Sequence, residues 1–231
     1  MDDEQRRQVS AFLRKGMWFG QLPEVTQARI LDRSVVRSYR KGQAVTREGD
    51  PPLGLSVLLA GRLWLVQHVG TEREHLVHVV EPGFWFGELA VLTGRPAAVT
   101  MVARTPARAL CLPRQAFEET ADQDPRFYRA VVQLAMGRYA LALRHISESH
   151  RLAAEGRLCA VLADRAEMRR WDRPDEKPVC LTLSQDELAR LVGLSRQTLN
   201  GLLQKLQKER LVQLSFRCIR VLDLAGLRRR P

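Results

Sequence analysis

SQDELARLVGLSRQTLNGLLQKLQKERLV, residues 184–212, predicts two short helices that meet at a glycine turn. Ser184 is followed three residues later by Glu187, a capping box that starts the first helix at the residue after the serine. Gly193 supplies a permissive backbone for a sharp turn, and Ser195 caps the second helix. This order predicts a helix-turn-helix, which places its second helix in the major groove of DNA.

The second helix has two distinct faces. At about 100° per residue, leucines gather on one side and polar residues on the other. The apolar side holds Leu199, Leu202, Leu203 and Leu206, and the outward side holds Arg196, Gln197, Asn200, Gly201 and Gln204. An arginine can pair with guanine, and the amides of Gln197 or Asn200 can pair with adenine. The alternative is a helical pair with a solvated polar face, but the coincidence of capping box, turn and second cap favours base reading.

Other residues of this module are predicted to hold phosphates. The hydroxyls of Ser184, Ser195 and Thr198 lie near helix N-termini, where they can fix the register without reading sequence. Beyond the helices, residues 211–214 and 218–222 predict two short strands around a turn at residues 215–217. This hairpin resembles a wing, with Arg217 and Arg220 placed to touch phosphates.

The bulk composition fits a DNA-binding protein. The chain has 231 residues, 45% hydrophobic and 27% charged, which is enough for two globular domains with a real core. A net charge of +11 favours a polyanionic partner such as double-stranded DNA. The sequence shows neither a membrane span nor a signal peptide, so we expect a cytoplasmic protein without a membrane partner. It also shows no convergent set of catalytic groups, so we expect no enzymatic activity.

The cysteines are far apart in the sequence. Cys111, Cys159, Cys180 and Cys218 lie in apolar settings whose spacing fits neither a disulfide framework nor a zinc site. The sequence therefore predicts four buried thiols.

The half that precedes the DNA module predicts a barrel or jelly roll. Its short apolar runs are separated by glycine turns and cover residues 55–59, 63–67, 76–80, 99–103 and 107–112. From Pro125 to about His150 a helix of about 25 residues is predicted, with a stripe of small and apolar residues suited to pairing with its own copy. The stripe comprises Val131, Leu134, Ala135, Tyr139, Ala142 and Ile146. Packing of this helix on its own β domain is the alternative.

In this order of parts the chain resembles the Crp/Fnr family of bacterial transcription regulators. The blocks that carry the resemblance are RKGQAVTREGD (40–50), LLAGRLWLV (58–66) and FGELAVLTGRP (86–96), followed by the helix-turn-helix. The resemblance implies an α+β fold: an N-terminal cyclic-nucleotide-binding-like β jelly roll with a helical lead (1–124), a dimerisation helix (125–152) and a C-terminal winged helix-turn-helix (153–231). It also implies a homodimer on a near-palindromic site and leaves RNA polymerase open as a partner.

The resemblance places an effector pocket at residues 87–98. Nucleotide-binding members use a glycine and a glutamate at the positions of Gly87 and Glu88, near Leu89, and an Arg-Ser pair where this chain has Ala97 and Ala98. Alanine offers a phosphate neither charge nor donor, which argues against cyclic AMP. Nearby Arg95 could substitute, although a solvated turn arginine is the commoner outcome. The effector therefore stays open between cyclic AMP, another small molecule and none.

Other sensing groups are not expected. The N-terminal region lacks the closely spaced cysteines of an iron-sulfur cluster. His75 and His78 fall on opposite faces of a strand, so with His68 they are interpreted as structural or surface residues rather than haem ligands. Trp64, Trp85 and Phe86 are interpreted as core, with an apolar ligand pocket as the alternative.

The sequence thus predicts a regulator whose β domain biases the spacing of two recognition helices through the long helix and a hinge near Ala153. The alternative is an effector-independent DNA binder whose β roll serves only as a dimerisation scaffold. In best-known members of the family a glutamate is common at the position of Gln197 and a second arginine at that of Gly201, so we expect a different half-site here.

Overall fold

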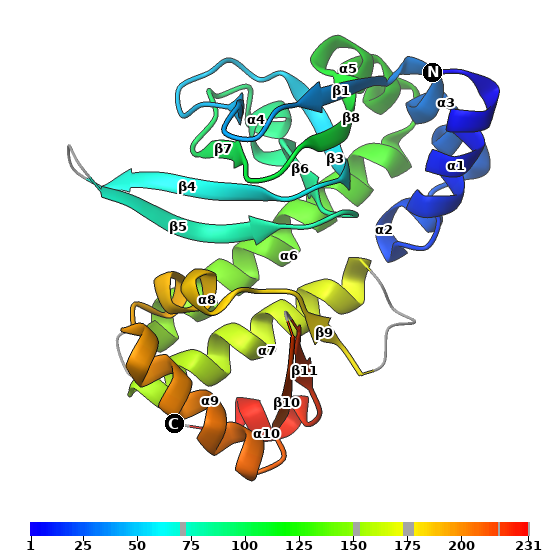
Figure 1. Cartoon of the computed structure of the whole chain (residues 1–231). Coiled ribbons are helices and arrows are strands. Elements are labelled where there is room, and N and C mark those ends of the chain that lie inside the picture. Colours follow the sequence, from blue (N-terminus) through cyan, green and yellow to red (C-terminus); the bar gives the residue numbers. More distant parts are fainter. Residues whose placement is uncertain (70–72, 150–152, 173–177, 217, 231) are drawn as a thin grey trace. The chain divides into compact units, whose positions relative to one another are not determined.

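The computed structural model describes residues 1–69, 73–149, 153–172, 178–216 and 218–230 and divides the chain into two compact units, residues 1–137 and 138–231 (Figure 1). The long helix α6 (Pro125–Ser149) contributes residues to both units. Among the helices of these ranges, none is long and apolar enough to cross a bilayer.

The first unit opens with three helices: α1 (Asp3–Leu13), α2 (Met17–Gly20) and α3 (Glu24–Arg33). The side chain of Asp2 caps α1 by accepting a hydrogen bond of 2.7 Å from the Gln5 N–H. Arg14, which ends α1, donates to the side-chain carbonyl of Gln27 on α3 at 2.8 Å. A side-chain cap therefore starts α1, and a polar contact joins its end to α3.

Two antiparallel four-stranded sheets form the body of this unit, with strand orders β1-β8-β3-β6 and β2-β7-β4-β5. Their strands are β1 (Val35–Tyr39), β2 (Ala44–Thr46), β3 (Gly54–Ala60), β4 (Leu63–Val69), β5 (Arg73–Val80), β6 (Trp85–Phe86), β7 (Thr100–Ala103) and β8 (Ala107–Pro113). The predicted jelly-roll architecture is confirmed, and each of the five predicted runs coincides with a strand. The strands β1, β2 and β6 were not predicted, because they are short or half-exposed on both faces.

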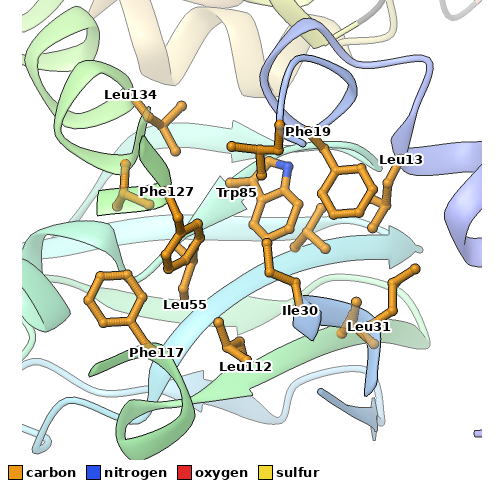
Figure 2. Close-up of a cluster of buried hydrophobic side chains, with 14 of the residues drawn as sticks. Leu13, Phe19, Ile30, Leu31, Leu55, Trp85, Leu112, Phe117, Phe127 and Leu134 are labelled. Atoms are coloured by element: carbon orange, nitrogen blue, oxygen red, sulfur yellow. The ribbon is translucent and has the colours of Figure 1, made fainter. Parts of the chain in front are cut away.

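A single hydrophobic cluster joins the helices to the first sheet (Figure 2). Trp85 of β6 lies at its centre, 5.9 Å from the ring of Phe19 and 4.5 Å from that of Trp18. Phe117 of α5 (Arg114–Gln123) meets Phe127 of α6 edge to face at 5.3 Å. The interpretation of Trp85 as core is therefore confirmed. The N-terminal part of α6 also belongs to this core, since Phe127, Val131 and Leu134 are buried.

The second unit contains α7 (Ala154–Asp172), α8 (Gln185–Val192), α9 (Arg196–Lys208) and α10 (Leu224–Arg228). A three-stranded sheet completes it, in the order β10 (Val212–Ser215), β11 (Cys218–Val221), β9 (Cys180–Leu181). Arg228 ties α10 to α7 through Asp164 at 2.5 Å and Glu167 at 2.9 Å. Burial opposes its charge, but these two carboxylates outweigh that effect and raise the pKa of Arg228.

One prediction about the cysteines is wrong. Cys180 and Cys218 form a disulfide between β9 and β11, with Cα atoms 5.6 Å apart, and both residues are half-buried rather than buried. They are 38 residues apart in the chain, so the antiparallel sheet that joins them is a tertiary feature that spacing does not reveal. Cys111 and Cys159 are buried free thiols, as predicted.

Candidate nucleic-acid interface

The capping box at the start of α8 is present in full. The Ser184 side chain accepts from the Glu187 N–H at 3.2 Å, and the Glu187 carboxylate accepts from the Ser184 N–H at 2.8 Å. The Ser184 hydroxyl also donates to that carboxylate at 2.9 Å. Because Glu187 is buried, this reciprocal pair fixes where the helix begins, at Gln185 as predicted.

The turn between α8 and α9 depends on Gly193. This residue has φ 69°, in the left-handed region, and its N–H donates to the Ala189 carbonyl. Ser195 then caps α9 by accepting from the Thr198 N–H at 3.1 Å, and its hydroxyl lies 2.8 Å from that of Thr198. Two caps and one glycine thus set the angle between the helices, and the structure confirms the predicted helix-turn-helix.

The faces of α9 follow the predicted period. Leu199, Leu203 and Leu206 are buried, whereas Arg196 and Gln197 are exposed and Asn200 is half-exposed. The Arg196 side chain is 67% exposed and lies 3.8 Å from the Asp186 carboxylate of α8. An exposed ion pair of this length contributes little to stability, so the guanidinium can exchange Asp186 for another partner at small cost.

The predicted phosphate contacts lie at the two helix starts. The hydroxyls of Ser184, Ser195 and Thr198 are on exposed residues, and each takes part in a local hydrogen bond. Arg217 lies outside the described residues. Arg220 is half-buried on β11, where its guanidinium donates to the Gln213 side chain of β10 at 3.1 Å.

The hairpin of β10 and β11 forms the predicted wing, anchored to α9. The Gln207 side chain accepts from the Leu214 N–H at 2.8 Å, which couples the end of the recognition helix to the first strand. At the hairpin turn Phe216 is 90% exposed. Phe216 was not predicted as a contact residue. The sequence does contain a signal for its exposure, because an aromatic residue in a two-residue turn between strands has no core to pack into.

The segment of residues 87–98 is built around α4 (Glu88–Thr93). Gly87 precedes the helix with φ 90°, and a Cβ there would lie 2.3 Å from the Gly54 carbonyl oxygen. Glu88 is half-buried and Leu89 exposed, both in the first turn of α4, and Arg95 is exposed after its end. The backbone of Ala97 pairs with the β2–β3 loop, donating to Asp50 and accepting from Gly49, each at 2.8 Å.

Ala98 is exposed next to Ala97. The six predicted pocket residues lie on one short helix, at its N-cap and in the segment that follows it. Trp64 is half-buried on β4, and the guanidinium of Arg104 lies 3.7 Å from its ring centre.

Comparison with known families accounts for both units. The cyclic nucleotide-binding domain model matches residues 36–124, and the Crp-like helix-turn-helix domain model matches residues 156–230. The chain belongs to the Crp/Fnr family of transcription regulators. The first model includes the whole segment 87–98, and the second includes both helices of the turn motif and the wing.

Known proteins and solved structures are similar to this chain over most of its length. The CRP-like cAMP-activated global transcriptional regulator of Mycobacterium tuberculosis is 24% identical over 192 residues, which cover 83% of this chain and 86% of that protein. A Crp/Fnr regulator of Thermus thermophilus has a solved structure that is 26% identical, with a TM-score of 0.57, covering 84% of this chain and 96% of that one. FixK2 of Bradyrhizobium japonicum shares the fold at 19% identity and a TM-score of 0.69, covering 84% and 95%.

The Mycobacterium tuberculosis and Thermus thermophilus proteins are named as transcriptional regulators, which is consistent with a regulatory role for this chain.

Proposed function

We propose that α9 reads base edges in the major groove, with Arg196 on a guanine and Gln197 or Asn200 on an adjacent adenine. The observation that carries this proposal is that Arg196 and Gln197 are exposed and Asn200 half-exposed on a helix whose start is set by the Ser195 cap after a glycine turn. Ser184, Ser195, Thr198 and Arg217 would position the phosphates, and the wing, including Arg220 and Phe216, would lie beside the recognition helix on the same duplex.

The protein acts in this proposal as a homodimer paired through α6, the helix assigned to residues 125–152. Met136, Tyr139 and Leu143 are exposed apolar residues spaced by three and four positions, so they form one stripe along this helix. A second copy of the stripe would cover them. Val131 and Leu134 of the predicted stripe pack in the core of the first unit. The proposed dimer contact therefore uses the residues of α6 that follow them.

The β roll is proposed to bind a small effector without the usual arginine partner for a cyclic phosphate, because Ala97 and Ala98 stand at those positions. The same two alanines favour the second candidate function, an effector-independent regulator whose β roll serves only as a scaffold. In this proposal the protein is located in the cytoplasm, with RNA polymerase as a candidate partner. The proposal also divides the chain into three parts, residues 1–124, 125–152 and 153–231.

A selected DNA site tests the reading of α9. Binding sites recovered from a randomised duplex pool should be near-palindromic, with half-site centres about 10 base pairs apart, and should protect both half-sites from cleavage. Sedimentation of the complex should give two chains per duplex. A single unrepeated site bound by one chain would contradict the dimer while leaving base reading by α9 intact.

Calorimetric titration with cyclic AMP tests the β roll. The wild-type chain is expected to release no heat at millimolar ligand, whereas Ala97→Arg combined with Ala98→Ser should gain binding, since the pair restores a charge and a donor for the phosphate. The charge-matched control is Ala97→Lys combined with Ala98→Ser, which adds the same charge without the planar fork of arginine. Micromolar binding to the wild-type chain would contradict the proposal and make it a nucleotide sensor.

A further inference from the structure

The disulfide of the second unit lies on the outward face of its small sheet. Arg220 pairs with Cys180, and Cys218 is two residues before Arg220, so alternation along the strand puts both cysteines on the same face. The opposite face carries the buried side chains of Val212, Ile219 and Val221. The two sulfur atoms therefore lie outside the hydrophobic core.

Their exposure separates these cysteines from the other two. Cys180 and Cys218 are half-buried, whereas Cys111 and Cys159 are buried. Burial raises the pKa of the Cys159 thiol to about 11, which keeps it protonated and unreactive. A small oxidant or a reducing thiol can approach Cys180 and Cys218 on the outward face of the sheet, but it cannot reach the buried Cys111 and Cys159.

The bond joins two parts of the candidate DNA interface. Cys180 lies in β9, four residues before the Ser184 cap of α8, and Cys218 begins the strand that follows the wing turn. Strand β9 has two residues, and two register pairs hold it to β11. With so few backbone hydrogen bonds, a covalent bond between β9 and β11 contributes a large share of the connection between this wing strand and the segment that leads into α8.

We propose that Cys180 and Cys218 are a reversible redox pair that controls DNA affinity. This inference rests on the proposed DNA-binding function. A protein that works on DNA in the cytoplasm meets glutathione and thioredoxin, which keep most thiols reduced, so a disulfide there is typically transient. The signal would then enter through the DNA-binding unit and not through residues 87–98.

The chemistry requires a hydroperoxide and, for reversal, a thiol reductant. One cysteine thiolate attacks the peroxide oxygen, which breaks the O–O bond and gives a sulfenic acid and an alcohol or water. The second thiol attacks that sulfur, forming the S–S bond and releasing water. Two electrons pass from sulfur to the peroxide, and both thiol protons end in the products. A reducing dithiol reverses the process through a mixed disulfide.

The oxidised form is the tighter binder in this proposal, because the bond orders the wing against α8 before DNA arrives. Fluorescence anisotropy on the selected site should give a Kd about tenfold lower for peroxide-treated than for dithiothreitol-treated protein, since the reduced chain must order this edge on binding. Mass spectrometry of the digested protein should find the Cys180 and Cys218 peptides joined only in the oxidised sample.

Three variants of the full chain complete the test. Cys218→Ser and the double variant Cys180→Ser with Cys218→Ser should bind with the affinity of the reduced form under both treatments. Cys159→Ala removes a thiol from α7 of the same unit and should keep the full response. Circular dichroism checks that each variant folds, and if the serine variants do not fold, the wild-type titration alone decides.

The outcomes separate the two proposals. Equal affinity of the oxidised and reduced wild-type protein overturns the switch and leaves DNA reading in place. A bond that survives excess reduced glutathione also overturns it, because the disulfide would then be structural. If neither form binds any selected duplex, the proposed DNA-binding function fails and the switch of DNA affinity fails with it, whereas the peptide analysis still reports whether the pair cycles.

Discussion

Two regions of the molecule each combine a glycine, a short helix and candidate contact residues: the helix-turn-helix of residues 184–208 and the β-roll segment of residues 87–98. They differ in the chemistry of the contact residues. In the first, Gly193 and the serine caps set the backbone, and Arg196 remains on the outward face. In the second, Gly87 meets a steric requirement, but the proposed pocket has Ala97 and Ala98 where the resemblance places phosphate-binding residues. On the proposal above, the second region has the backbone of a nucleotide site without the side chains that would hold a phosphate.

The largest expected effect concerns the backbone of the β-roll segment. In Gly87→Ala the new Cβ would lie 2.3 Å from the Gly54 carbonyl oxygen, at a φ of 90° that L side chains rarely adopt. The left-handed conformation and the overpacking together should lower the free energy of unfolding by about 2–4 kcal/mol. Urea denaturation followed by tryptophan fluorescence measures this, since Trp85 is in the adjoining core.

Gly94→Ala is the matched control for that variant. Gly94 ends α4 with φ 67°, but a Cβ added there would meet nothing within 4 Å, so only the conformational cost of about 1–2 kcal/mol applies. Equal losses of unfolding free energy in the two variants would show that the approach of position 87 to the Gly54 carbonyl is not what requires glycine. The steric side of the comparison between the two regions would then fail.

The next effect concerns the outward face of α9. Arg196→Ala should weaken binding to the selected site by about 1–3 kcal/mol, because a bidentate contact to guanine is lost. Lys208→Ala removes the same charge from the exposed far end of the helix and should cost much less. Electrophoretic titration measures the affinity of each variant for the preferred site and for a site in which the contacted guanine is replaced. Undiminished specificity in Arg196→Ala would mean that the helix is docked differently.

The helix caps offer a way to separate stability from DNA contact. Ser195→Ala removes the acceptor for the Thr198 N–H and should lower the free energy of unfolding by about 1 kcal/mol. Ser195→Asp keeps an acceptor at this position and should preserve stability, but its negative charge beside a phosphate should weaken DNA binding. Thermal unfolding and anisotropy are measured on both variants. If Ser195→Asp binds DNA as well as the wild type, this hydroxyl does not face the backbone of the duplex.

The sequence predicts those parts of the molecule that local chemistry determines. The caps at Ser184 and Ser195, the turn at Gly193 and the buried leucines of α9 follow from spacing within one or two helical turns, and the structure confirms them. The two wing strands agree with their predicted bounds to within one residue. The contact roles assigned to Arg196, Gln197 and Asn200 stay predictions.

The remaining features depend on partners that are distant in the sequence. Strand β9 has two residues and exists because β11 pairs with it, and the Cys180–Cys218 bond follows from that pairing. Similarly, the helical spacing of the stripe on α6 does not show which part of it is buried and which part is exposed. Phe117 and the helical lead bury its first part, Val131 and Leu134, whereas Tyr139 and Ala142 stay exposed.

The smallest expected effect returns to the glycine of the recognition helix. A Cβ at Gly201 would meet nothing within 4 Å, and the residue is exposed inside α9, so Gly201→Ala should raise the free energy of unfolding by about 0.5–1 kcal/mol through the lower entropy of the unfolded chain. Differential scanning calorimetry measures the gain. With the same substitution, Gly87 and Gly201 should respond in opposite directions, because one glycine meets a steric requirement and the other does not. A more than tenfold loss of DNA affinity in Gly201→Ala would reveal that the duplex approaches the backbone there, and Gly201 would then be retained for its ligand as Gly87 is for its fold.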